Sequence, residues 1–179
     1  YHDRGLLPSA KLAGMMAAAI LSDTVMFKSP TCTKKDIAMA ERLARIARIS
    51  LKDLGRELFS STSDGKSAEE LLGTDYKELH ISGQTIGVGQ ITCVDSSKLV
   101  ERRDEFIAAM EKVKQNSNCD LVILMITDVL LDGSHIFYVG SDDVMQEAFS
   151  TVPKDKHMFL PKVMSRKKQI IPMLTAMWG

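Results

Sequence analysis

Three consecutive cations near the end of the chain have the residue types that bind phosphate. Residues 165–169 read Ser-Arg-Lys-Lys-Gln. The guanidinium of Arg166 offers a planar fork that matches two phosphate oxygens, and the ammonium of Lys167 offers a mobile point charge. We therefore interpret these two residues as ligands of a small anion, although composition alone favours a solvated basic turn. Lys168 is left out of the site, because adjacent side chains cannot all face one ligand.

Lys66 and Asp23 are two further candidates for phosphate chemistry. Lys66 follows a glycine in a polar loop, and that glycine would let the loop move over a bound ligand. An exposed loop lysine without a function is nevertheless the common case. Asp23 ends a strongly apolar helix, where a carboxylate buried without a cation is costly. From the residues alone Asp23 could simply mark the end of the helix, although carboxylate oxygen is a ligand type that manganese, cobalt and magnesium accept.

Two segments carry a resemblance to a known family. Residues 19–31 read Ala-Ile-Leu-Ser-Asp-Thr-Val-Met-Phe-Lys-Ser-Pro-Thr. Together with residues 165–169 they resemble, in order and spacing, two signatures of the manganese-dependent (family II) inorganic pyrophosphatases. The resemblance covers essentially the whole chain, and two signatures together are more specific than either alone.

The resemblance implies a role for each candidate residue. Lys66, Arg166 and Lys167 would bind pyrophosphate and offset charge in the transition state. Asp23 would ligate Mn²⁺, or alternatively Co²⁺ or Mg²⁺, in an intact enzyme that hydrolyses pyrophosphate to two phosphates. No residue of this chain is assigned a catalytic role, because the attacking group implied by the family is water activated by the metal.

The implied metal centre is incomplete in this chain. The family takes most of its metal ligands from a preceding DHH-type domain, including an Asp-His-His run that is missing here. The histidines His2, His80, His135 and His157 are scattered without ligand spacing, and those in expected strands suit structural roles better. One carboxylate cannot hold two ions about 3.5–4 Å apart. The chain is therefore expected to be the C-terminal portion of such an enzyme and to be inactive on its own.

Two alternatives to the pyrophosphatase hypothesis stay open. The same cations could serve a non-catalytic module that binds phosphate or a nucleotide. They could also belong to a related DHH-type hydrolase of polyphosphate or phosphoesters. Nucleic acid is not an expected partner, because the net charge is zero and the aromatic residues, 6% of the chain, do not interleave with the basic run.

Composition also bears on compartment and assembly. No run approaches the roughly 20 apolar residues of a membrane span, so no membrane partner is expected. The cysteines Cys32, Cys93 and Cys119 have no metal-ligand spacing, and an odd number fits free thiols in a reducing, cytoplasmic compartment.

The resemblance implies a homodimer for the intact enzyme. For the fragment it leaves open a monomer or a pair formed through an exposed Ala/Met helix.

Hydrophobic periodicity predicts the elements that must position these residues. It indicates an α/β fold, with a mixed β-sheet flanked by helices and preceded by helices alone, which the resemblance implies are the remnant of an N-terminal domain. Residues 1–50 would be that remnant and linker, and residues 51–179 the pyrophosphate-binding domain. The expected helices are 9–21, 35–47, 51–59, a short one after Ser67, 96–114, 144–149 and one from Pro172; the expected strands are 76–81, 85–94, 120–127 and 134–139.

Two weaker motifs favour structural interpretations. Gly87-Val88-Gly89 is a fragment of a dinucleotide fingerprint, but it lies inside a strand and lacks the third glycine. It predicts a bulge or a close approach of backbone instead. Thr127-Asp128 ends the most apolar strand, where ligands often gather, yet we favour a cap on the turn that follows.

Overall fold

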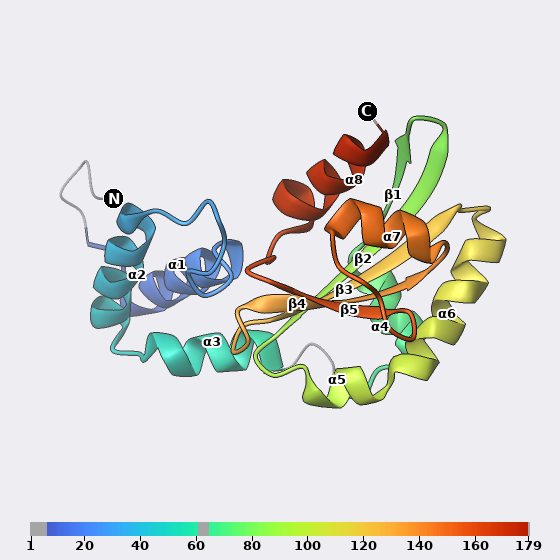
Figure 1. Cartoon of the computed structure of the whole chain (residues 1–179). Helices are drawn as coiled ribbons and strands as arrows, with labels where there is room; N and C mark the ends of the chain where they lie inside the picture. Colours follow the sequence, from blue (N-terminus) through green and yellow to red (C-terminus); the bar gives the residue numbers. More distant parts are fainter. Residues whose placement is uncertain (1–6, 61–64, 179) are drawn as a thin grey trace. The chain divides into compact units, whose positions relative to one another are not determined.

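The computed structural model describes residues 7–60 and 65–178 of the 179-residue chain. It contains two compact units, Tyr1–Ser61 and Thr62–Gly179 (Figure 1). The division falls later than the predicted boundary at residue 50, because helix α3 (Leu51–Ser60) packs against the helices that precede it. The assignment of a metal-binding remnant and a pyrophosphate-binding domain to these parts stays a prediction.

The first unit is helical, as predicted. Helix α1 (Ala10–Asp23) and helix α2 (Lys34–Ala47) pack closely, and small side chains such as Ala13 and Ala17 are fully buried between them. The start of α2 has a complete capping box: the Thr33 hydroxyl accepts from the Asp36 amide, and the Asp36 carboxylate accepts from the Thr33 amide. This arrangement satisfies two backbone donors that a helix start would otherwise leave without partners.

The second unit is built on a five-stranded sheet whose order is β1-β2-β3-β4-β5. Strands β2 and β3 are parallel and every other neighbouring pair is antiparallel, so the sheet is mixed, as predicted. The strands are β1 (Tyr76–Ile81), β2 (Gln84–Cys93), β3 (Leu121–Asp128), β4 (Gly133–Val139) and β5 (His157–Pro161). Strand β5 was not predicted, because it is a five-residue edge strand that ends in a proline.

Helices cover both faces of this sheet (Figure 1). One face carries α4 (Ala68–Thr74), α5 (Ser97–Glu101) and α6 (Arg103–Asn116), and the other carries α7 (Asp142–Phe149) and α8 (Ile171–Trp178). The predicted single helix 96–114 was wrong in one respect, since it breaks at Arg102 into α5 and α6. Strand β3 is buried along its whole length, which explains its unbroken apolar sequence.

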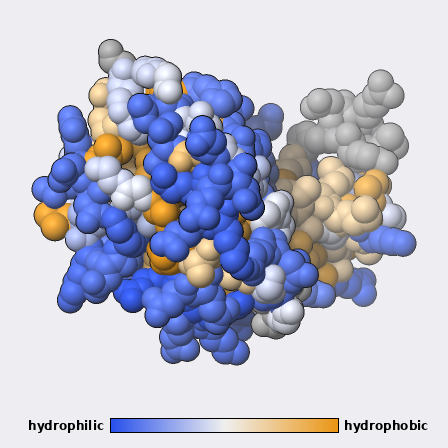
Figure 2. All heavy atoms as spheres, turned by 90° about the vertical axis from the view of Figure 1, so that its right-hand side faces the viewer, coloured by the Kyte–Doolittle hydropathy of each residue, from blue (hydrophilic) through white to orange (hydrophobic). Residues whose placement is uncertain are grey.

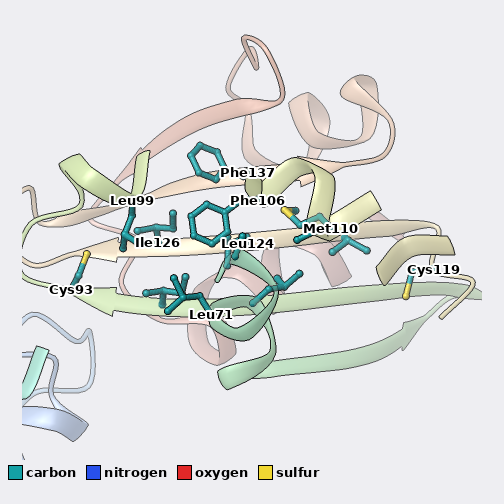
Figure 3. Close-up of a cluster of buried hydrophobic side chains, with 14 residues drawn as sticks. Leu71, Cys93, Leu99, Phe106, Met110, Cys119, Leu124, Ile126 and Phe137 are labelled. Carbon is teal, nitrogen blue, oxygen red and sulfur yellow. The ribbon is translucent and has the colours of Figure 1, made fainter. Parts of the chain in front are cut away.

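The core under α6 is centred on aromatic and branched side chains (Figure 3). Phe106 is completely buried, and its ring lies 6.3 Å from that of Phe137. At the paired glycines the sequence predicted a bulge or a close approach of backbone, and the structure shows side chains packed directly on both glycines. A Cβ atom on Gly87 would lie 1.8 Å from the Tyr76 hydroxyl oxygen, and one on Gly89 would lie 2.9 Å from a Leu72 methyl group.

Outside this core, the face seen in Figure 2 is mainly hydrophilic, with apolar side chains in small groups. Scattered apolar side chains of this kind are ordinary on protein surfaces. Within the described residues, no helix has both the length and the apolar character that a membrane crossing requires.

Two histidines form a hydrogen-bonded pair between β4 and β5. His135 Nδ1 and His157 Nε2 are 2.9 Å apart, while the ring centroids are 5.1 Å apart, so the two ring edges face each other. Burial lowers the pKa of His135 despite the opposing effect of Asp128. Burial, then His135, then Arg103 lower the pKa of His157. One ring must donate and the other accept, so the pair is stable when at least one imidazole is neutral.

We expect the free energy of unfolding to decrease as the pH is lowered through this pair. Histidine in the unfolded chain keeps its ordinary pKa of 6.5, whereas both folded values are lower, so the unfolded state binds more protons in acid. The stabilisation is present above the unfolded value and is lost as the pH falls through the folded values. Urea denaturation between about pH 8 and about pH 5 measures it. The double variant His135→Phe/His157→Phe should show a smaller pH dependence than the parent, and an equal slope in the two proteins would contradict the prediction.

Candidate functional site

The basic segment forms a tight turn directly after β5. Residues Arg166–Ile170 make a short π-helix, η2, and the hydroxyl of Ser165 caps it by accepting from the Lys168 amide. Arg166 is only 7% exposed, whereas Lys167 beside it is exposed. The two cations that the sequence placed together thus have different environments.

The guanidinium of Arg166 is held by three acceptors. Its Nη1 donates to the carbonyl oxygens of Asp75 at 2.7 Å and of Val88 at 3.1 Å, and its Nη2 donates to Asp75 Oδ1 at 2.8 Å. Nε makes no hydrogen bond to any described residue, and it is not among fully buried atoms without a partner. One N–H on Nε and one on Nη2 are thus left without a described partner, and such a pair of N–H groups can donate to two oxygens side by side.

The side chain of Gln169 closes the loop that carries Arg166. Its Oε1 accepts from the amides of Met164 at 2.8 Å and Ser165 at 3.0 Å, and its Nε2 donates to the carbonyl of Lys162 at 2.9 Å. Gln169 therefore holds the backbone of this loop in place through three hydrogen bonds, a structural role that its position in the sequence did not reveal.

Replacing Gln169 with alanine is expected to loosen this loop. Three backbone groups lose their partner, which should lower the free energy of unfolding by about 1–3 kcal/mol. We expect the candidate site to bind phosphate more weakly at the same time, because Arg166 is attached to the loosened segment. Calorimetric titration and urea denaturation of Gln169→Ala measure the two effects. Gln115→Ala, on the exposed part of α6, is the control. Equal binding and equal free energies of unfolding in the two variants would show that Gln169 does not hold the loop in place.

A buried polar network ties the same loop to the sheet. The hydroxyls of Thr127 and Ser134 are 3.0 Å apart, and Ser134 donates to the carbonyl of Val163 at 2.5 Å. Gln90 Nε2 donates to Thr127 Oγ1 at 3.1 Å and to the carbonyl of Met164 at 3.4 Å. Sequence reasoning missed these residues, and the available signal was the presence of polar side chains in otherwise buried strands.

The predicted turn cap at the end of β3 is confirmed. Asp128 Oδ2 accepts from the amide and the hydroxyl of Ser96, at 2.8 and 2.6 Å, and Oδ1 accepts from the Leu131 amide at 2.8 Å. Both carboxylate oxygens are thus engaged in holding the two loops at the carboxyl ends of β2 and β3. Asp128 is a structural residue.

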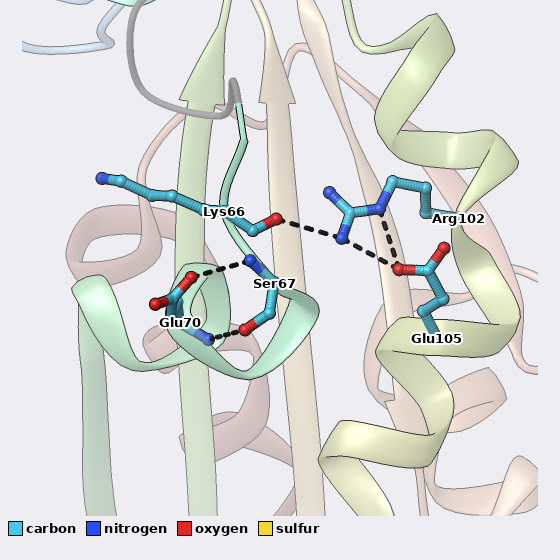
Figure 4. A network of polar contacts seen from close by, with 5 residues as sticks. All are labelled: Lys66, Ser67, Glu70, Arg102 and Glu105. Atoms are coloured by element: carbon cyan, nitrogen blue, oxygen red, sulfur yellow. Dashed lines mark hydrogen bonds and ion pairs between the residues drawn. The ribbon is translucent and has the colours of Figure 1, made fainter.

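Lys66 lies just before α4, in a short network that fixes its backbone (Figure 4). Its carbonyl oxygen accepts from Arg102 Nη2 at 3.2 Å, and Arg102 also forms an ion pair with Glu105 at 2.9 Å. Ser67 and Glu70 complete the predicted capping box of α4. The Lys66 side chain extends away from this network and makes no hydrogen bond or ion pair with a described residue.

The structure places Lys66 and Arg166 at opposite ends of one short helix. Lys66 precedes α4, and Asp75, which holds Arg166, is the C-cap of α4. Seven helical residues separate the two ends by about 10 Å. Lys167 makes no hydrogen bond or ion pair with a described residue either. A surface hollow of about 550 Å³ lies elsewhere, near Cys119, so the convergence of the three cations on one pocket stays a prediction.

Asp23 is the exposed last residue of α1, in the first unit. The three residues after Thr24 all have positive φ angles, 50° at Val25, 51° at Met26 and 67° at Phe27, which is costly for side chains of this size. Thr24 closes this left-handed turn, because its hydroxyl donates to the Ile20 carbonyl and accepts from the Phe27 amide.

The metal centre does not assemble from the described residues alone. Within 7–60 and 65–178, no three His, Cys, Asp or Glu side chains are grouped so that they could hold a metal ion. The carboxylate of Asp23 has the chemistry that manganese prefers, but a single carboxylate is an incomplete ligand set. Its role as a metal ligand stays a prediction.

Comparison with known proteins assigns the family. Residues 56–177, well over half of the chain, match the model of the DHHA2 domain. The chain belongs to the DHHA2 domain family. Among curated relatives, a probable manganese-dependent inorganic pyrophosphatase of Clostridium acetobutylicum is 37% identical over 98% of this chain, and a manganese-dependent one of Methanothrix thermoacetophila is 40% identical over 97%. A cobalt-dependent inorganic pyrophosphatase of Clostridium perfringens is 36% identical over 98% of this chain and 32% of its own length.

A solved structure agrees with this assignment. The crystal structure of a putative family II inorganic pyrophosphatase from Methanococcus jannaschii superimposes with a TM-score of 0.83 and 34% identity, covering 97% of this DHHA2 chain and 57% of that one. The resemblance inferred from the two signatures is thereby confirmed. The chain spans 58% of the length of the first two curated relatives, so the activity of a whole enzyme is a matter for proposal.

Proposed function

We propose that this DHHA2 chain is the C-terminal, substrate-binding portion of a divalent-metal-dependent inorganic pyrophosphatase. The observation that carries the proposal is Arg166. A nearly buried guanidinium is oriented by three protein acceptors, while its Nε has no partner among the described residues. A guanidinium that is fixed through its terminal nitrogens and keeps free N–H groups is suited to bind the oxygens of a phosphate.

The cations of this unit suit the charge of pyrophosphate. The substrate carries three to four negative charges on a compact group, and phosphoryl transfer depends mainly on positioning and on electrostatic stabilisation. We propose that Arg166 grips two oxygens of one phosphate and that Lys66 and Lys167 neutralise the remaining charge. Because both ammonium groups lack protein partners among the described residues, their charge is available to a ligand. The π-helical turn at Arg166 supports this, since such turns are frequent at functional sites.

The divalent metal of the proposed enzyme is inferred from the relatives. They are named for manganese or cobalt, and such an ion supplies Lewis-acid activation of water when bound. We propose Asp23 as the one metal ligand contributed here. A homodimer of the intact enzyme rests on the family resemblance alone. A cytoplasmic location is supported by the free thiols of Cys32, Cys93 and Cys119.

Two measurements test the proposal. Calorimetric titration of the 179-residue chain with pyrophosphate, a nucleotide and an oligonucleotide should show a preference for pyrophosphate. Joining the chain to the part of the Clostridium acetobutylicum relative that it does not cover should give a completed enzyme that releases phosphate with manganese. The chain alone should release none. A completed enzyme without activity above background would defeat the proposal, and a preference for a nucleotide would favour the alternative of a binding module.

A further inference from the structure

We propose that Asp75 is a positioning residue that fixes which edge of the Arg166 guanidinium meets the substrate. The inference rests on the proposed pyrophosphate-binding function and adds to it a residue that touches Arg166 and not the reacting atoms. Three geometric observations support it: the location of Asp75, the edge of the guanidinium that it occupies, and the unequal burial of the two side chains.

Asp75 is itself held firmly by the sheet. It ends α4 and directly precedes β1, and its carbonyl oxygen accepts from the Gln90 amide at 3.0 Å as well as from Arg166 at 2.7 Å. Its backbone is therefore fixed by the pairing of β1 with β2. The carboxylate on this fixed backbone accepts from Arg166 Nη2 at 2.8 Å.

The Asp75 contacts select one orientation of the guanidinium. Asp75 accepts from both terminal nitrogens, from Nη1 through its carbonyl and from Nη2 through its carboxylate, and the Val88 carbonyl also accepts from Nη1. Because the group is planar and rigid, these contacts fix its orientation and leave Nε without a partner among the described residues. Without the carboxylate the guanidinium could rotate. Its Nε could then donate to the carbonyl oxygen of Asp75 or Val88 and would no longer be available to a phosphate.

The burial of the two partners argues against a purely structural salt bridge. The Arg166 side chain is 8% exposed, whereas that of Asp75 is 50% exposed. A half-exposed carboxylate adds little stability through charge alone. It also places a negative charge near the proposed anion site, which by simple electrostatics should weaken pyrophosphate binding. If Asp75 positions Arg166, its replacement should weaken pyrophosphate binding. If only its negative charge matters, its replacement should strengthen binding.

The test is calorimetric titration of pyrophosphate into the parent chain and into Asp75→Asn and Asp75→Ala. Positioning predicts that Asp75→Ala binds at least about tenfold more weakly, although the variant is less negative. Asp75→Asn keeps an oxygen acceptor for Nη2 and should stay close to the parent. Asp120→Ala is the matched control, since Asp120 is an aspartate of the same unit whose carboxylate accepts from the Thr85 amide of β2 and not from Arg166. The Nε–H resonance of Arg166 in a heteronuclear NMR spectrum should move with pyrophosphate in the parent and not in Asp75→Ala.

Each outcome has a defined meaning. If Asp75→Ala is folded by circular dichroism and binds as tightly as the parent or more tightly, the positioning role is refuted while the proposed function stands. If Asp75→Ala does not fold, the inference rests on Asp75→Asn, whose Arg166 Nε–H resonance must still respond to pyrophosphate. If the parent chain fails to bind pyrophosphate at all, the proposed substrate grip fails, and the positioning role falls with it.

Discussion

Replacing Arg166 with lysine is expected to lower the turnover of the completed enzyme by on the order of 100- to 1000-fold. A lysine keeps the positive charge but has one nitrogen in place of the planar fork. It cannot satisfy the Asp75 and Val88 acceptors and also present two parallel donors to a phosphate. Most of the loss should appear in the turnover number, because the fork matters most when charge moves onto the leaving phosphate.

Steady-state phosphate release and urea denaturation together check this result. The free energy of unfolding of Arg166→Lys should fall by about 1–3 kcal/mol, as acceptors near the start of β1 lose a donor. Arg103→Lys is the matched control, because Arg103 is an arginine of the same unit that pairs with Asp104 and Asp155 at the surface. Turnover of Arg166→Lys within a few-fold of the parent would show that charge alone is sufficient there.

Replacing Phe106 with alanine should lower the free energy of unfolding by about 3–5 kcal/mol, more than any other replacement proposed for this chain. Phe106 is completely buried between α6 and the sheet, and removing its ring leaves a cavity beside Phe137 that the surrounding strands cannot fill (Figure 3). The effect should extend to the Lys66 loop. Arg102, which holds the Lys66 carbonyl, also lies 5.5 Å above the Phe106 ring.

Urea denaturation of Phe106→Ala and Phe159→Ala measures this effect against a matched control. Phe159 is a phenylalanine of the edge strand β5 that is only partly buried. Its replacement should cost clearly less, because fewer contacts are lost and water can enter the space. Equal losses in the two variants would mean that the core under α6 relaxes far more than a close-packed interior allows.

Local signals in the sequence predicted most of the elements. Capping boxes at Thr33 and Ser67 marked the starts of α2 and α4, because the partner of each cap lies only three residues away. The apolar run of β3 marked the centre of the sheet for a similar reason, since burial on both faces is written into consecutive residues. Strand β5 lacked such a signal. It exists because β4 offers it a partner, and its own five residues do not specify it.

The candidate site was predictable in residue type and not in arrangement. The sequence by itself determined that a cluster of cations ends this chain, that a mixed α/β sheet carries it and that the chain resembles pyrophosphatases. Only the tertiary structure decided that Arg166 is nearly buried while Lys167 is exposed, and that the Gln169 side chain holds the backbone of the loop before it. The reason is that the acceptors of Arg166 lie 91 and 78 residues away along the chain, at Asp75 and Val88, and only the folded sheet brings them to the guanidinium.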